Sequence, residues 1–133
     1  MKTDDKTIES EIIAKGLTAP RVTPADIEAN IASEHYFTAG DGYAGALSVS
    51  PEFQQAEFAG EIPVINPPES LDLLTFCVLV LNNGFTVTGE SACASPENFD
   101  AEIGRKIARE NAMQKIWPLM GYVLKEKLHN ATV

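Results

Sequence analysis

A β-hairpin over residues 74–93 is the feature that most constrains the fold of this chain. Leu74–Leu81 is an apolar run rich in strand formers, and Phe85–Cys93 reads as the returning strand. Between them lie Asn82, Asn83 and Gly84, and an Asn-Gly pair tolerates the positive φ angles that a type I′ turn requires. With a two-residue Asn-Gly loop, we expect the cross-strand pairs Val80–Val87, Val78–Gly89 and Phe76–Ser91.

The two strands differ in what they present to their surroundings. Leu74–Leu81 is apolar on both faces, so we expect a central strand or a strand buried at an interface, and a homo-oligomer follows from the second alternative. Thr86, Thr88 and Glu90 alternate along the second strand and therefore share one face. That polar face can serve a ligand or a partner, although an ordinary solvent-exposed strand looks the same.

Two helices are predicted after the hairpin. Asn98 and Asp100 are suitable N-caps for a long helix, whose apolar stripe is predicted to be Ile103, Ile107, Ala108, Ala112 and Ile116. Trp117-Pro118 is expected to break or kink the chain, and a last helix is predicted over residues 119–128. The fold class is therefore α/β in the α+β sense: a hairpin-containing antiparallel sheet packed with C-terminal helices and a helical N-terminal segment.

The first half of the chain gives weaker signals. Residues 1–22 read as an N-terminal arm that is ordered only if something covers it, and residues 23–133 as a single domain. Thr23 and Pro24 predict a helix that ends near Glu34-His35. Residues 39–42 are interpreted as a flexible turn. The stretch 37–70 is proline-rich over residues 51–68, and is interpreted as an insertion, a lid or an oligomer contact.

Charge and composition exclude several classes of function. The net charge is −9, with −11 in residues 1–97 and +2 in residues 98–133. Such a chain is not expected to bind nucleic-acid polymers or anionic membranes. No apolar run is long enough to span a bilayer, which predicts a cytoplasmic protein. His35 and His129 are far apart and no C-x-x-C motif is present, so neither a metal nor a cofactor is expected.

Arg105 and Arg109 are the strongest candidates for binding a ligand. They are four residues apart, so they leave the predicted helix on the same side, and two guanidinium groups can hold two phosphates of one small ligand. The alternative is a solvated face in which Asp100 and Glu102 pair with the local cations. Further candidates are the aromatic residues that can stack a base and the polar residues that can bind a ribose or a base edge: Phe76, Phe85, Phe99 and Trp117, and Thr86, Thr88, Glu90 and Ser91.

Catalytic signatures are missing from the sequence. It contains no G-x-S-x-G and no H-E-x-x-H motif, and Ser91 has no evident base partner. We therefore do not expect an enzyme.

The C-terminal half resembles a family of small phage and prophage proteins. The resemblance rests on residues 81–93 (LNNGFTVTGESAC), 96–100 (PENFD), 102–108 (EIGRKIA) and 115–122 (KIWPLMGY), with an upstream block at 31–37 (IASEHYF). The family is identified as the one that includes the first-described Thoeris anti-defence proteins.

This resemblance implies a sponge that binds cyclic ADP-ribose isomers made by bacterial TIR-domain immune enzymes and holds them uncleaved. Some relatives also sequester cyclic di- or trinucleotides in a second pocket, and they assemble as dimers that build hexamers. The family's pair of arginines one turn apart corresponds to Arg105 and Arg109, and its adenine-stacking aromatic to Phe37, Phe76 or Phe85. Two alternatives stay open: an acidic protein that binds a host protein through residues 37–70, and a small nucleotide-acting enzyme with Glu90 or Asp100 as base.

Overall fold

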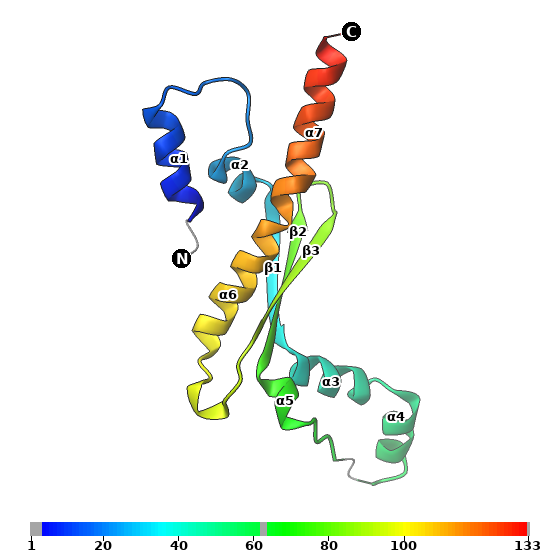
Figure 1. Cartoon of the computed structure of the whole chain (residues 1–133). Coiled ribbons are helices and arrows are strands. Elements are labelled where there is room, and N and C mark those ends of the chain that lie inside the picture. The colour runs from blue at the N-terminus through cyan, green and yellow to red at the C-terminus, as the bar shows by residue number, and fades with distance from the viewer. Residues whose placement is uncertain (1–3, 62–63, 133) are drawn as a thin grey trace.

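The fold is built around a three-stranded antiparallel sheet in the order β1-β2-β3 (Figure 1). The computed structural model describes residues 4–61 and 64–132. Strand β2 (Leu74–Leu81) lies at the centre, between β1 (Ile31–Thr38) and β3 (Thr86–Ala92). Helix α6 (Ala101–Gln114) packs along one face, after a short 3-10 helix η1 (Pro96–Asn98). The predicted α+β fold and the central position of the apolar strand are confirmed.

The hairpin is present, but its predicted register was wrong by one residue. The observed pairs are Val80–Thr86, Val78–Thr88 and Phe76–Glu90. Gly84 has φ +88°, whereas no residue other than glycine has positive φ in the described part of the chain, so a type I′ turn cannot form. Instead the Leu81 amide donates to Phe85 O at 2.8 Å across a three-residue loop. The slip places Thr86, Thr88 and Glu90 on the same face as Phe76, Val78 and Val80.

Strand β1 replaces the second half of a predicted helix. Helix α2 (Pro24–Ala29) begins as expected, with a capping box between Thr23 and Asp26, but it ends at Ala29 and not near Glu34-His35. Asn82 fixes this end, because its amide nitrogen donates to Ala29 O at 2.9 Å and its backbone N–H donates to Asn30 O at 3.0 Å. Residues 31–38 then pair with β2, and that ladder overrides the helical spacing of Ile27 and Ile31.

The predicted apolar stripe is confirmed at Ala108, Ala112 and Ile116, which are fully buried, but it was wrong at two isoleucines, because α6 contacts the sheet through small residues. Gly104, Ala108 and Ala112 are buried, while Ile103 and Ile107 are 56% and 45% exposed. The reason is close approach: a Cβ on Gly89 of β3 would lie 2.2 Å from Ala108 O and 2.3 Å from Ala112 N. The core between α6 and the sheet consists of Ile27, Cys77, Leu79, Leu81, Val87, Ala108, Ala112 and Ile116.

Helix α7 (Ile116–Ala131) is longer than predicted and extends past the sheet (Figure 1). The expected break lies at Lys115, between α6 and α7. Pro118 falls in the first turn of α7, where its missing N–H removes no helical hydrogen bond. The second half of α7 is exposed on most sides.

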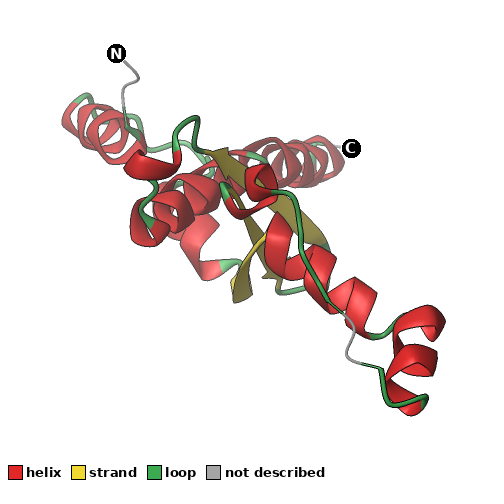
Figure 2. Ribbon diagram, turned by 90° about the horizontal axis from the view of Figure 1, so that it is seen from below, coloured by secondary structure: helices red, strands yellow, loops and turns green. Residues whose placement is uncertain are grey.

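Residues 39–72 form a helical projection that we call the arm. It contains α3 (Ala39–Ser48), α4 (Pro51–Phe58) and α5 (Glu69–Asp72). Residues 39–42 were wrongly interpreted as a turn: Thr38 and Asp41 form a capping box, so these residues begin α3. Pro51 takes the first position of α4, where proline is tolerated. Figure 2 shows the arm extending away from the sheet. Ile62 and Pro63 lie outside the described residues.

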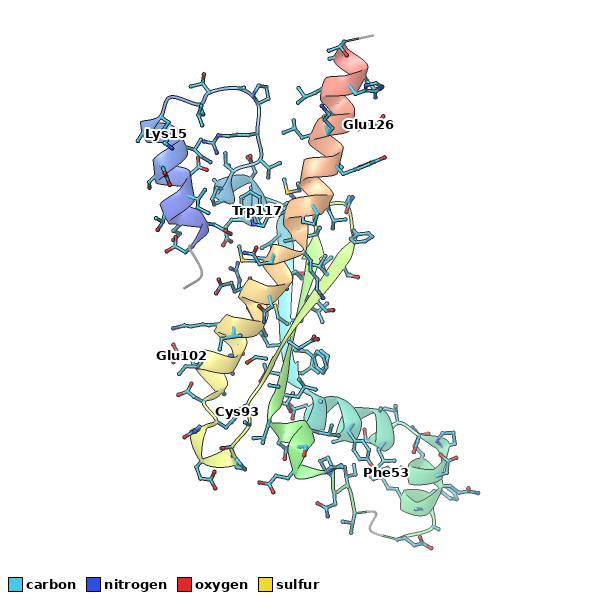
Figure 3. All side chains as sticks on the ribbon, in the orientation of Figure 1. Lys15, Phe53, Cys93, Glu102, Trp117 and Glu126 are labelled. Atoms are coloured by element: carbon cyan, nitrogen blue, oxygen red, sulfur yellow. The ribbon has the colours of Figure 1, made fainter. Side chains whose placement is uncertain are left out.

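The N-terminal segment contains α1 (Asp5–Ala14), which packs near the junction of α6 and α7. The Asp5 carboxylate accepts hydrogen bonds from the Trp117 indole at 3.1 Å and from Gln114 at 3.2 Å, and Figure 3 shows Trp117 on this side of α7. Arg21 forms a bidentate pair with Glu9. Among the described residues, no helix combines the length and apolarity that a membrane crossing requires.

Candidate functional site

The sheet has a second face, which we call the open sheet face. Helix α6 packs on the face that carries the buried residues Thr75, Cys77, Leu79 and Leu81 of β2, and the opposite side chains of β2 are only half-buried. The observed register places nine residues on this second face: Ser33, His35, Phe37, Phe76, Val78, Val80, Thr86, Thr88 and Glu90. Four predicted site residues therefore share one surface, namely Phe37, Phe76, Thr88 and Glu90.

An aromatic pair occupies the end of the open sheet face nearest the arm. The ring centroids of Phe37 and Phe76 are 5.7 Å apart with an interplanar angle of 39°. Gly42 of α3 lies against the Phe37 ring, since a Cβ there would sit 3.5 Å from it. Phe37 is nevertheless 41% exposed. An exposed ring held in this way offers a flat apolar surface on which a planar base can stack.

Arg105 borders a small pocket beside this aromatic pair. The pocket has a volume of about 110 Å³ and is lined by Tyr36, Phe37, Thr38, Asp41, Thr75, Phe99, Ala101 and Arg105. Within the described part of the chain, Arg105 makes no ion pair and no hydrogen bond. The Asp41 carboxylate is engaged by the Thr38 amide at 3.1 Å. The pocket therefore brings aromatic residues and hydroxyl-bearing residues close to a guanidinium group whose donors are available.

Arg109 has different surroundings, although it lies one helical turn from Arg105. Its Nη2 donates to Glu28 Oε2 at 2.9 Å and its Nε to Glu34 Oε2 at 3.0 Å. Hydrogen bonding to Glu28 raises the pKa of the Arg109 guanidinium and lowers the pKa of the Glu28 carboxyl. Arg109 thus joins α6 to α2 and β1. It does not line the Arg105 pocket, so the structure does not bring the two arginines to one cavity.

The network around Arg109 continues into the protein. Glu34 Oε1 accepts a hydrogen bond from the Tyr36 hydroxyl at 3.0 Å. Burial is the main cause of the raised pKa of Tyr36, and burial likewise raises the pKa of the Cys77 thiol. The Tyr36 hydroxyl and the Cys77 thiol therefore stay protonated near neutral pH, and both lie close to the ion pairs of Arg109 as neutral groups.

The remaining predicted residues lie apart from the aromatic pair. Ser91 pairs with Thr75, so its side chain is on the α6 face and half-buried. Phe85 follows the hairpin turn, where its amide donates to Asn83 Oδ1 at 2.9 Å. Sequence reasoning missed Tyr36, Thr38 and the Ser33–His35 hydrogen bond of 3.0 Å, because β1 was read as a helix. The Thr38–Asp41 capping signal could have revealed the end of the strand.

A larger hollow lies at the other end of the molecule, and we call it the α7 groove. It has a volume of about 490 Å³ and lies between α2, the hairpin turn and α7. Apolar, amide and charged side chains all line it. The lining consists of Arg21, Val22, Asp26, Ala29, Asn30, Asn82, Asn83, Met120, Val123, Leu124 and Lys127.

Fold and site together describe a small α+β protein with a candidate binding surface: an uncovered sheet face next to one arginine-lined pocket. The sequence model of the Phage protein (N4 Gp49/phage Sf6 gene 66) family matches residues 22–128, so the chain belongs to this family of phage proteins. The match begins after α1 and includes the sheet, the arm and most of α7. No curated protein and no solved structure matches the chain.

Proposed function

We propose that this phage protein is a sponge that binds cyclic ADP-ribose-type immune messengers and holds them without cleaving them. The observation that supports the proposal is that Arg105 and Phe37 line one pocket, together with Tyr36, Thr38 and Thr75. This is the place where a group that binds phosphate and a ring that can stack a base occur together.

The chemistry of the ligand suits these groups. A cyclic ADP-ribose isomer carries a pyrophosphate, for which a planar guanidinium fork is the best-matched side chain. Its adenine can stack on an exposed phenyl ring, and its ribose hydroxyls can bond to threonine and tyrosine. The net charge of −9 repels long polyanions, whereas one local guanidinium still attracts a small anion.

The size of the pocket indicates that one chain supplies only part of the site. Ligand pockets generally measure about 300–1,000 Å³, and the Arg105 pocket measures about 110 Å³. The open sheet face next to it carries an apolar row on β2, namely Phe76, Val78 and Val80. A second copy packed on this face would deepen the pocket and exclude water from the bound ligand.

The test is messenger retention by the purified protein. The protein is incubated with a cyclic ADP-ribose isomer produced by a TIR-domain enzyme, washed, and then denatured. We expect intact messenger in the released fraction. Chemically altered messenger would indicate an enzyme, and no uptake would favour the alternative of a protein that binds a host protein; either result contradicts the sponge.

Two substitutions on α6 sharpen this test. Arg105→Ala removes charge-assisted hydrogen bonds and should weaken messenger binding by about 30- to 1,000-fold in calorimetric titration. Lys106→Ala is the matched control, because Lys106 pairs with Glu102 at 3.2 Å on the surface of the same helix. Equal affinity of the Arg105→Ala variant and the parent would place the ligand elsewhere.

A further inference from the structure

Helix α1 and the loop that follows it form a segment, residues 4–20, that we call the strap. None of the ten residues of α1 is fully buried, and residues 13–20 are all exposed. Figure 1 shows the loop arching away from the sheet before the chain enters α2. The family model matches the chain only from Val22 onward. The strap therefore lies outside the part of the chain that the family match includes.

Two carboxylates hold the strap in place. Asp5 Oδ2 accepts hydrogen bonds from the Trp117 indole at 3.1 Å and from Gln114 Nε2 at 3.2 Å, and these bonds join α1 to the junction of α6 and α7. Glu9 pairs with Arg21, just after the loop ends, where Arg21 Nη1 donates to Glu9 Oε2 at 2.6 Å. Asp5 therefore provides the polar link between α1 and the C-terminal helices, and Glu9 folds the loop back onto α1.

The apolar surface beneath the strap is incompletely filled. A hollow of about 210 Å³ borders α1, and its apolar lining consists of Ile8, Ile12, Val22, Pro24 and Trp117. A second hollow, of about 380 Å³, shares Asp5 and Trp117 with the first. Side chains that border a hollow lose dispersion contacts on that side. Apolar packing therefore adds little to the docking of α1, which depends largely on the bonds of Asp5.

We infer that the strap opens as a unit while the sheet and α6 stay folded, and that its opening uncovers Trp117. An isolated helix of ten residues is marginal in water, so α1 unfolds when it leaves Trp117. Trp117 is half-buried in the closed state, and opening joins the two hollows beside it into one apolar surface. The strap is therefore a gate over Trp117. The gate is separate from messenger binding, because the lining of the Arg105 pocket begins at Tyr36.

The test is hydrogen exchange of the full chain, followed by mass spectrometry, in urea concentrations below the unfolding transition. Amides of α1 should be about 100-fold less protected than amides of β2, because they exchange when the strap opens and do not require the sheet to unfold. Strap opening exposes little surface, so the protection of α1 should change little with urea. The protection of β2 should fall steeply over the same range.

Two variants on α1 identify the contact that closes the gate. Asp5→Ala removes the acceptor for Trp117 and Gln114 and leaves the N-cap, Asp4, intact. It should lower the protection of α1 amides about tenfold. It should also increase the quenching by acrylamide of Trp117, which is the only tryptophan of the chain. Glu11→Gln is the matched control, because Glu11 pairs with Lys15 of the strap itself at 3.5 Å, so both measurements should stay at the parent's values.

A third variant separates opening of the strap from unfolding of the whole protein. Gly89→Ala introduces a methyl group between β3 and α6, away from the strap. It should lower the protection of β2 amides and leave that of α1 amides unchanged. The inference is overturned if the protection of α1 and β2 falls in parallel, either in Gly89→Ala or in the parent as urea rises. It is also overturned if Asp5→Ala matches the parent in exchange and in quenching.

Discussion

At the scale of single residues, the roles of the two arginines of α6 depend on their neighbours in space, and their spacing along the helix does not determine those roles. Arg105 and Arg109 are equivalent in the sequence pattern, and their spacing predicted a joint grip on phosphate. In the structure, Arg109 faces two carboxylates from α2 and β1, whereas Arg105 lies in a pocket with hydroxyl groups and Phe37. The two carboxylates lie 75 and 81 positions from Arg109, and Phe37 lies 68 positions from Arg105, so the sequence around α6 could not predict the difference.

Arg109→Gln is expected to lower the free energy of unfolding by about 1 kcal/mol. The cost is modest because Glu28 and Glu34 are partly exposed and can be solvated once the guanidinium is gone. Urea unfolding followed by circular dichroism measures it. Arg105→Gln is the matched control, and an equal loss of stability in both variants would contradict this account.

Acid is expected to destabilise the protein through the same ion pairs. The pKa of Glu28 is lowered by its bonds to Arg109, and the pKa of Glu9 by its bonds to Arg21. A lowered folded-state pKa means that the unfolded chain binds protons first as the pH falls, so stability present at neutral pH is lost below the ordinary value of 4.5. The urea midpoint should therefore fall from about pH 5 downward, and less steeply in Arg109→Gln. A midpoint that rises in acid would contradict the assignment.

At the scale of elements, the contact between α6 and the sheet depends on residues without bulk. Gly89→Ala is expected to destabilise the protein by about 3 kcal/mol, because the new methyl group would meet the backbone of α6 at Ala108 and Ala112. Gly121→Ala on α7 is the matched control. A Cβ there meets nothing within 4 Å, so alanine should stabilise the helix by about 0.5–1 kcal/mol. Urea unfolding of both variants tests this, and a well-tolerated Gly89→Ala would show that the helix can shift away.

Elements with strong local signals were predictable, and those decided by tertiary contacts were not. The apolar strand β2, the turn at Gly84 and the helix cap at Asp100 are each indicated by residues within a short stretch of sequence. Strand β1 does not, since its partner lies about 40 residues later in the chain. The hairpin register depended on whether Asn83 adopts positive φ, which its side chain permits but does not require. Within the predicted apolar stripe, Ile103 and Ile107 were wrongly placed in the core because hydrophobicity was considered without the close approach of α6 to Gly89.

At the scale of the whole molecule, we expect self-association through the open sheet face. Val78→Glu places a charge at its centre, so we expect this variant to have a mass near 14.4 kDa at low protein concentration and the parent to have a larger mass, as measured by multi-angle light scattering. Ile103→Glu, on the outer side of α6, should leave the mass unchanged. A Val78→Glu variant with the parent mass, or a parent that is itself a monomer, would show that this face is simply solvated.

The candidate site was predictable in part. The sequence pattern placed Thr86, Thr88 and Glu90 on one face, and the resemblance included Phe37 and Phe76 among the possible stacking residues. The strand pairing brings Phe37, Phe76, Thr88 and Glu90 to one surface, and only tertiary packing brings Arg105 close to Phe37. Ser91 lies on the opposite face because successive residues of a strand point to opposite sides of the sheet. Phe85 lies before β3 begins, next to the hairpin turn.

The stretch without lysine or arginine between Arg21 and Arg105 also determines how the protein can be cut and labelled. Trypsin cleaves after these two residue types, so α2, all three strands and the arm stay together in one peptide from Val22 to Arg105. The arm therefore resists trypsin for a reason unrelated to its rigidity. Amine-directed cross-linkers attach only outside this stretch. A protease that cleaves at glutamate is the appropriate probe of the arm, because Glu52, Glu57 and Glu61 lie along it.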